Sequence, residues 1–189
     1  LGQWISNLGS QISFYGLGLW LFSRADQLGP YAAVALVVQL GRLFALPVLG
    51  RHLQHWPRRR VMGNAYGLGG CVTAAVAVSL WQLGEAMPLP LLLALLSAGA
   101  MAEAALVLSF STLIPQLVAP GQLGRANGFF ATSDGLVYLV APYLGALCAS
   151  RLGLFGVLGV DLFSFAVALA CLGFGRWPRA ASRPMTPAA

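Results

Sequence analysis

Residues 90–113 read PLLLALLSAGAMAEAALVLSFSTL, and Glu103 is the only charged side chain in this run. A helix that crosses a bilayer needs about 20 mostly apolar residues, and this run is long enough to do so. Five similar runs accompany it along the chain. The sequence therefore predicts an all-α membrane protein, a bundle of six transmembrane helices over residues 3–23, 31–50, 61–83, 90–113, 126–149 and 153–175.

The composition points to lipid as the surrounding medium. Hydrophobic residues make up 58% of the 189 residues and charged residues only 8%, whereas a soluble domain carries about 25% charged residues. Arginine supplies every positive charge, in short runs between apolar segments. This pattern does not suit a nucleic-acid-binding face. The cysteines lack metal-type spacing, so we expect neither a metal site nor a cofactor.

The arginines also predict how the chain is oriented. The connections after the second and fourth segments and the tail hold eight of them, namely Arg51, Arg58, Arg59, Arg60, Arg125, Arg176, Arg179 and Arg183. The opposite connections hold two arginines and two acids, namely Arg24, Arg151, Asp26 and Glu85. By the positive-inside rule, the side with eight arginines is cytoplasmic. We therefore predict a multi-pass protein of the cell (inner or plasma) membrane with both termini in the cytoplasm. Residues 1–175 then form the bundle and residues 176–189 a cytoplasmic tail. Because Leu1 already lies in an apolar run, we expect the natural chain to begin upstream.

Several polar residues lie inside the predicted spans. Ionisable groups at that depth are costly and usually face a cavity or a partner. We therefore predict a substrate and proton pathway from Arg42, Glu103 and Asp134, together with Asn7 and Gln11 of a polar stripe on the first segment. Glu103 is either a proton-coupling carboxylate or a structural acid neutralised by Arg42. The third and sixth segments have few polar residues and are expected to face lipid, with Asp161 in helix packing or capping.

The two halves of the chain share a short pattern. PVLG at residues 47–50 and PYLG at residues 142–145 lie in the second members of two three-helix groups that run in opposite directions. Inverted three-helix repeats are common in transporters, so a 3+3 inverted repeat is predicted. Pro142 and Gly145 are expected to bend the fifth segment and to let it pack closely.

The stretch GRHLQHWPRRR at residues 50–60 resembles the loop 2–3 signature of the major facilitator superfamily, a Gly, three residues, an Asp and then a basic cluster. Gly50, Arg58 and Arg59 fall on this gating motif, whereas Gln54 replaces its Asp. A plain positive-inside anchor is the alternative interpretation. Three further stretches are similar to the branch that contains the enterobactin exporter and macrolide efflux proteins: LIPQLV at 113–118 with QLGRANG at 122–128, GVDLFSF at 159–165, and APYLGA at 141–146 as a worn fifth-helix antiporter motif.

The resemblance covers essentially the whole chain but only the N-terminal half of the twelve-helix family fold. It implies a secondary active exporter of small amphipathic compounds such as drugs or siderophores, working by alternating access and coupled to a proton gradient as an antiporter. Membrane lipid and a C-terminal six-helix half, from the same protein or a second copy, are the implied partners. The alternative is a six-helix membrane protein with a structural or assembly role, or a truncated half-transporter without transport of its own. No catalytic residues are predicted, because both histidines lie in a loop away from the buried serines, so the chain is not expected to be an enzyme.

Overall fold

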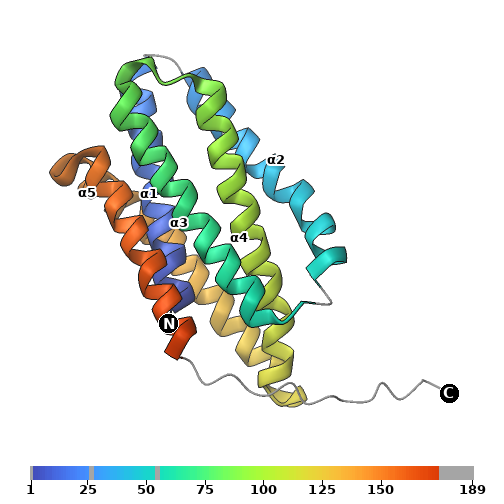
Figure 1. Cartoon of the computed structure of the whole chain (residues 1–189). Helices are drawn as coiled ribbons and strands as arrows, with labels where there is room; N and C mark the ends of the chain where they lie inside the picture. The colour runs from blue at the N-terminus through green and yellow to red at the C-terminus, as the bar shows by residue number, and fades with distance from the viewer. Residues whose placement is uncertain (1, 26–27, 54–55, 175–189) are drawn as a thin grey trace.

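A computed structural model describes residues 2–25, 28–53 and 56–174, and this part of the chain is helical throughout apart from short turns (Figure 1). Five α-helices follow one another: α1 (Gly2–Ala25), α2 (Leu28–Leu53), α3 (Arg58–Leu83), α4 (Leu89–Leu117) and α5 (Leu123–Phe174). The short 3-10 helices η1 (Gly84–Ala86) and η2 (Pro120–Gln122) precede α4 and α5. Each of the first four predicted segments lies within one of the first four helices.

Helix α5 combines the last two predicted segments. Its backbone leaves the helical conformation at Gly153, where φ is 69° and ψ is −177°. This region of backbone space favours glycine, which has no Cβ to clash. Figure 1 shows that α5 runs away from one end of the bundle, turns, and runs back towards the same end. We call residues 123–152 the first limb and residues 154–174 the second limb. The predicted count of six helices is therefore not confirmed, since the described residues form five helices with a break inside the fifth.

Four of the described helices are long and apolar enough to cross a bilayer: α2 over Ala32–Arg51, α3, α4 over Leu89–Pro115, and α5. Helix α1 has the length but is less apolar, because its polar residues recur along most of its turns. Many of these polar residues face the protein interior, and Ser6, Gln11 and Ser13 are buried. The predicted span over residues 3–23 therefore depends on shielding by other helices rather than on hydropathy alone.

Helix α1 packs between the two limbs of α5. Gly2, Gly9 and Gly16 recur every seven residues and meet the second limb, where a Cβ on Gly9 would lie 2.6 Å from the Cβ of Ser164. On the first limb, a Cβ on Gly145 would lie 3.0 Å from the carbonyl oxygen of Ile12. Small residues at such positions let helix backbones approach closely within a membrane. The close packing predicted for Gly145 is thus present, with α1 as its partner.

The other helices pack in pairs around this centre. Helix α3 contacts both α4 and α5, and the core there includes the buried residues Met62, Tyr66, Leu106 and Phe165. Helix α2 packs mainly on α4 and is the least buried of the candidate spans. It stands at the edge of the bundle in Figure 1. Its exposed apolar side chains include Leu36, Leu43, Phe44 and Val48. This face suits contact with lipid or with further apolar protein surface.

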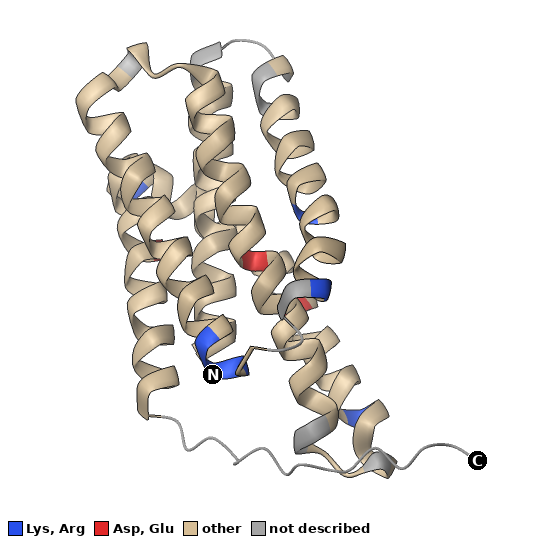
Figure 2. Ribbon diagram, turned by 45° about the vertical axis from the view of Figure 1, so that its right-hand side comes forward, with Lys and Arg blue, Asp and Glu red and all other residues tan. Residues whose placement is uncertain are grey.

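Most of the described arginines gather at one end of the bundle. The end of α2, the start of α3 and the start of α5 carry five of them, namely Arg51, Arg58, Arg59, Arg60 and Arg125. Figure 2 shows most of the basic positions near the lower end, and acidic positions at mid-height and below it. This one-sided distribution is the pattern on which the predicted orientation rests.

Candidate functional site

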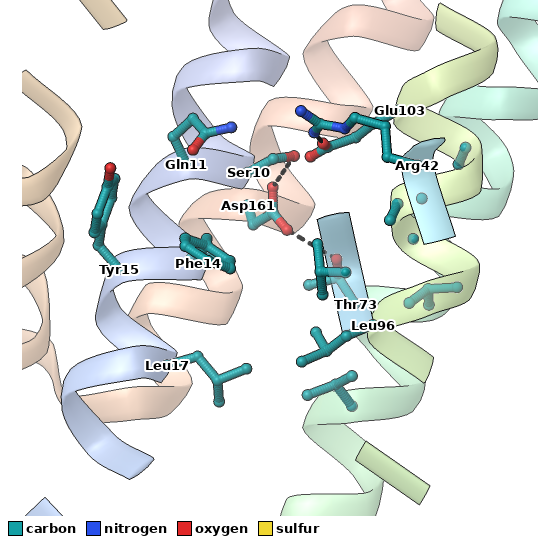
Figure 3. A pocket seen from close by; sticks show the side chains of 18 of the residues that line it. Ser10, Gln11, Phe14, Tyr15, Leu17, Arg42, Thr73, Leu96, Glu103 and Asp161 are labelled. Carbon is teal, nitrogen blue, oxygen red and sulfur yellow. Dashed lines mark hydrogen bonds and ion pairs between the residues drawn. The ribbon is translucent and has the colours of Figure 1, made fainter. Parts of the chain in front are cut away.

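A cavity of about 350 Å³ lies inside the bundle and is lined by residues of all five helices (Figure 3). Its wall is largely apolar. The charged side chains that line it are Arg42 of α2, Glu103 of α4 and Asp161 of the second limb, and polar groups of α1 and α3 accompany them. A mostly apolar chamber with a few convergent polar groups has the general character of a small-molecule site.

Arg42 and Glu103 form an ion pair that connects α2 to α4 across 61 positions of sequence. Each side chain is 26% exposed. Within the described part of the chain, Nε of Arg42 is buried without a hydrogen-bond partner. The pairing is the arrangement expected if Glu103 is a structural acid neutralised by Arg42. It also places both side chains at the cavity, so it does not decide whether Glu103 has a part in proton coupling.

Asp161 is held by hydroxyl groups from two other helices. Its side chain is among the buried ones, and the residue is 4% exposed. Ser10 of α1 donates to Oδ1 at 3.0 Å, and Thr73 of α3 donates to Oδ2 at 2.8 Å (Figure 3). Asp161 therefore does contribute to helix packing, as its position predicted. Sequence reasoning missed its place in the cavity wall, although Thr73 stood out as one of the few polar residues of an apolar segment.

A second, smaller cavity of about 70 Å³ adjoins the first, and the two share lining residues that include Ser10, Arg42 and Glu103. Asn7 and Asp134 line the smaller cavity, where the Asn7 amide donates to Oδ1 of Asp134 at 3.2 Å. Gln11 lines the larger one and is 7% exposed. The structure thus brings all five residues of the predicted pathway to two neighbouring cavities.

The expectation that the third and sixth segments face lipid was wrong. Thr73 and Val76 of α3 line the larger cavity, and so do Asp161 and Phe165 of the second limb. The two segments also meet directly, because Gly69 leaves room for the ring of Phe165: a Cβ there would lie 2.6 Å from the ring. Each segment therefore has one side turned inward, towards the cavity, whereas the small number of its polar residues suggested the opposite.

The predicted gating motif lies at the basic end of the bundle. Gly50 is in the last turn of α2, and Arg58 begins α3. Arg59 donates from Nη2 to the carbonyl oxygen of Gly173 at 3.0 Å, near the end of α5. A basic side chain suits the free carbonyls and negative dipole end of a helix C-terminus. Gln54, which stands in place of the motif's Asp, and the tail at 176–189 lie outside the described residues.

Pro142 lies inside the first limb, three residues before Gly145. A proline within a helix cannot donate a backbone hydrogen bond, so the ladder is interrupted beside the close approach of α1 to the first limb. In the described ranges, no three His, Cys, Asp or Glu side chains cluster in a way that could hold a metal ion.

Comparison with known proteins gives the chain its family. Residues 1–188 match the family model described as Major Facilitator Superfamily. The chain is 27% identical over 185 residues to a protein named multidrug efflux pump Tap from Mycobacterium bovis (strain BCG / Pasteur 1173P2). The same values apply to the protein of that name from Mycobacterium tuberculosis (strain ATCC 25618 / H37Rv). No solved structure matches the chain.

The matched region covers 93% of this chain but 44% of each of these relatives. The chain therefore spans less than half the length of the curated relatives it matches. The apolar helices, the helical fold and the family match together support a multi-pass membrane protein. This chain belongs to the major facilitator superfamily.

Proposed function

We propose that this chain is the N-terminal six-helix half of a secondary active exporter of small amphipathic compounds such as drugs or siderophores. The observation that carries the proposal is the cavity of about 350 Å³ that holds charged and polar side chains at mid-bundle in a member of this superfamily. The name of the efflux pumps to which the chain is similar supports export as the direction of transport.

The chemistry of the cavity favours amphipathic substrates. Ligand pockets commonly have volumes of about 300–1,000 Å³, with apolar walls that bury the ligand and a few polar groups that orient it. Here Phe14 and Leu96 are among the apolar lining residues, whereas Gln11 and Arg42 supply polar groups. A C-terminal half, or a second copy of this chain, would complete the chamber. Arg42, Glu103, Asp134, Asn7 and Gln11 would line the pathway of the substrate or the proton.

Transport would proceed by alternating access, with proton entry driving export. In this proposal Gly50, Arg58 and Arg59 take part in closing the cytoplasmic side, and the contact of Arg59 with the end of α5 supports a role at that end. Pro142 and Gly145 would allow α5 to move or pack against α1 during the cycle. The 3+3 inverted repeat belongs to the same proposal, since its two groups would be α1–α3 and α4 with the two limbs of α5.

The proposed topology has six crossings of the cell (inner or plasma) membrane, with each limb of α5 crossing once and both termini cytoplasmic. Single reporter cysteines test it in a background from which Cys71, Cys148 and Cys171 have been removed. A membrane-impermeant thiol reagent added outside intact cells should label Ala86→Cys, which lies between α3 and α4. It should label Trp56→Cys only after the cells are opened. Labelling of Trp56→Cys from outside would reverse the proposed orientation.

Transport itself is tested with the natural protein, including any sequence beyond residue 189, reconstituted in lipid vesicles. A fluorescent amphipathic drug should accumulate in the vesicles only when a pH gradient is imposed. Glu103→Gln should alter this flux if Glu103 is on the proton pathway, whereas Ser111→Ala, an exposed position of the same helix, should leave it unchanged. Absence of flux with every gradient and drug class would favour the structural or assembly alternative.

A further inference from the structure

The three acids at the cavities have different surroundings. Glu103 is paired with Arg42. Asp134 accepts a hydrogen bond from the Asn7 amide and is partly exposed. Asp161 is 4% exposed, and within the described ranges it makes no ion pair. It is therefore the most deeply buried of the three, and no cation among the described residues pairs with its carboxylate.

The partners of Asp161 suit both of its protonation states. A guanidinium or ammonium group can only donate hydrogen bonds, so it would hold a carboxyl group in the ionised form. A hydroxyl group can rotate and either donate or accept. Ser10 and Thr73 can therefore donate to an ionised Asp161, and one of them can accept from the protonated acid without movement of the helices. Such a site can gain and lose a proton at little structural cost.

The groups around Asp161 on each packed helix support the same conclusion. Ser13 of α1 donates to the carbonyl oxygen of Val157 at 3.2 Å, and Ser164 donates to the backbone carbonyl of Asp161 itself at 2.7 Å. Across the cavity, α2 and α4 present Arg42 and Glu103, whose charges cancel. The first limb contributes Tyr138 to the lining. The charge of the larger cavity thus depends on the protonation state of Asp161.

We propose that Asp161 binds the transported proton, with Ser10 and Thr73 as its adaptable partners, and that loss of this proton prepares the cavity for a lipophilic monocation. This inference rests on the proposed exporter function. In the protonated state the cavity is neutral. When the proton leaves to water, the carboxylate gives the cavity one negative charge, which a cationic substrate can balance. One proton would enter for each monocation exported, so the exchange would be electroneutral.

The first test follows protonation directly and does not require transport. Infrared difference spectra of the complete protein in lipid, recorded over a pH series, should show one protonated carboxylic acid signal that disappears as the pH rises. Asp161→Asn should abolish this signal, and Glu103→Gln should keep it. Thr73→Val removes one partner and should shift the midpoint of the titration. An unchanged signal in Asp161→Asn would overturn the inference, and so would its loss in Glu103→Gln alone.

The second test uses tetraphenylphosphonium, a lipophilic monocation, in vesicles that contain the complete protein. The natural protein should drive its uphill movement with a pH gradient. Asp161→Asn should reduce this movement to the level of protein-free vesicles, because an amide cannot balance the charge of the cation, but it should still exchange a labelled for an unlabelled neutral drug without any gradient. A structural role for Asp161 would instead abolish both activities together. Ser111→Ala is the matched control for expression and folding, because its side chain is exposed on α4.

The outcomes separate this inference from the function on which it rests. Proton-driven movement that survives in Asp161→Asn overturns the inference and leaves the exporter in place, and so does movement that requires a sodium gradient. A natural protein that moves neither this cation nor a neutral drug under any gradient overturns the proposed function itself. If Asp161→Asn does not fold, Thr73→Val and Ser10→Ala provide the test instead. A shift in the pH at which half of the protonated-acid signal is lost supports the inference, and an unchanged pH overturns it.

Discussion

Substitution of Gly9 by alanine probes the contact on which the centre of the bundle depends. A Cβ on Gly9 would lie 2.6 Å from the Cβ of Ser164 and 2.2 Å from its hydroxyl oxygen. Carbon atoms in good contact are about 3.5–4.0 Å apart, so the added methyl group overlaps its neighbour by roughly 1 Å. Rotation of the Ser164 side chain moves its hydroxyl but not its Cβ. The overlap can therefore be relieved only if α1 and the second limb move apart.

The expected cost follows from this geometry. Overpacking of a well-packed core destabilises by about 1–3 kcal/mol. Replacing a glycine by alanine in a helix also stabilises the helix, by up to about 1 kcal/mol. To cancel this gain, the stability of Gly9→Ala should be compared with that of another glycine-to-alanine variant in a helix interior. Gly159 of the second limb is suitable, because a Cβ there would have no neighbour within 4 Å. Gly9→Ala should therefore be less stable than Gly159→Ala by about 1–3 kcal/mol.

Reversible unfolding in mixed micelles of mild detergent and sodium dodecyl sulfate, followed by circular dichroism, measures this difference. A second substitution identifies its source. Ser164→Gly removes the Cβ that Gly9→Ala would strike, so adding it to Gly9→Ala should recover most of the loss after correction for the single Ser164→Gly variant. Equal stability of Gly9→Ala and Gly159→Ala would refute the close approach of α1 to the second limb.

Four further substitutions test the ion pair, the Arg59 contact and the break in α5 in the same unfolding assay. Arg42→Gln and Glu103→Gln should each lower the stability of the protein by about 1–3 kcal/mol. This is less than the loss for a fully buried pair, because each side chain is 26% exposed. The double variant should lose less stability than the sum of the two single losses. A loss in the double variant equal to the sum of the two single losses would argue against a direct ion pair. Arg59→Gln removes an exposed contact with the end of α5 and should cost at most about 1 kcal/mol. Gly153→Ala forces a side chain into a backbone conformation with φ of 69° and should cost about 1–3 kcal/mol, whereas an unaffected variant would mean that this break can relax into a helix.

The sequence alone was sufficient to locate the apolar helices. The free energy of placing a residue in lipid depends mainly on that residue and on the length of the apolar run, so 31–50, 61–83 and 90–113 could be predicted without knowledge of their neighbours. The same reasoning applies to Arg42, Glu103 and Asp134. An ionisable group within an apolar helix is too costly to face lipid, so its position near a cavity could be predicted from sequence. The family followed from local motifs, and the family match confirms it.

Which faces of the helices meet was decided only by the tertiary structure. In a soluble protein, the polar face of a helix marks its solvent side. In lipid, both the core face and the outer face are apolar, so α3 and the second limb carry little periodic signal and their inward sides were missed. The contacts of Asp161 with Ser10 and Thr73 join residues 151 and 88 positions apart, and such pairs depend on how all the helices pack together.

The same reason explains the glycines and the fifth helix. Gly2, Gly9 and Gly16 are three of 23 glycines, and although their spacing of seven residues places them on one face of a helix, it does not show which helix meets that face. Their importance comes from the second limb, which approaches α1 at those three positions. The division of α5 likewise depends on one backbone conformation at Gly153. Local hydropathy determined where this chain can cross a membrane, whereas the cavity and its buried Asp161 exist only because distant helices pack together.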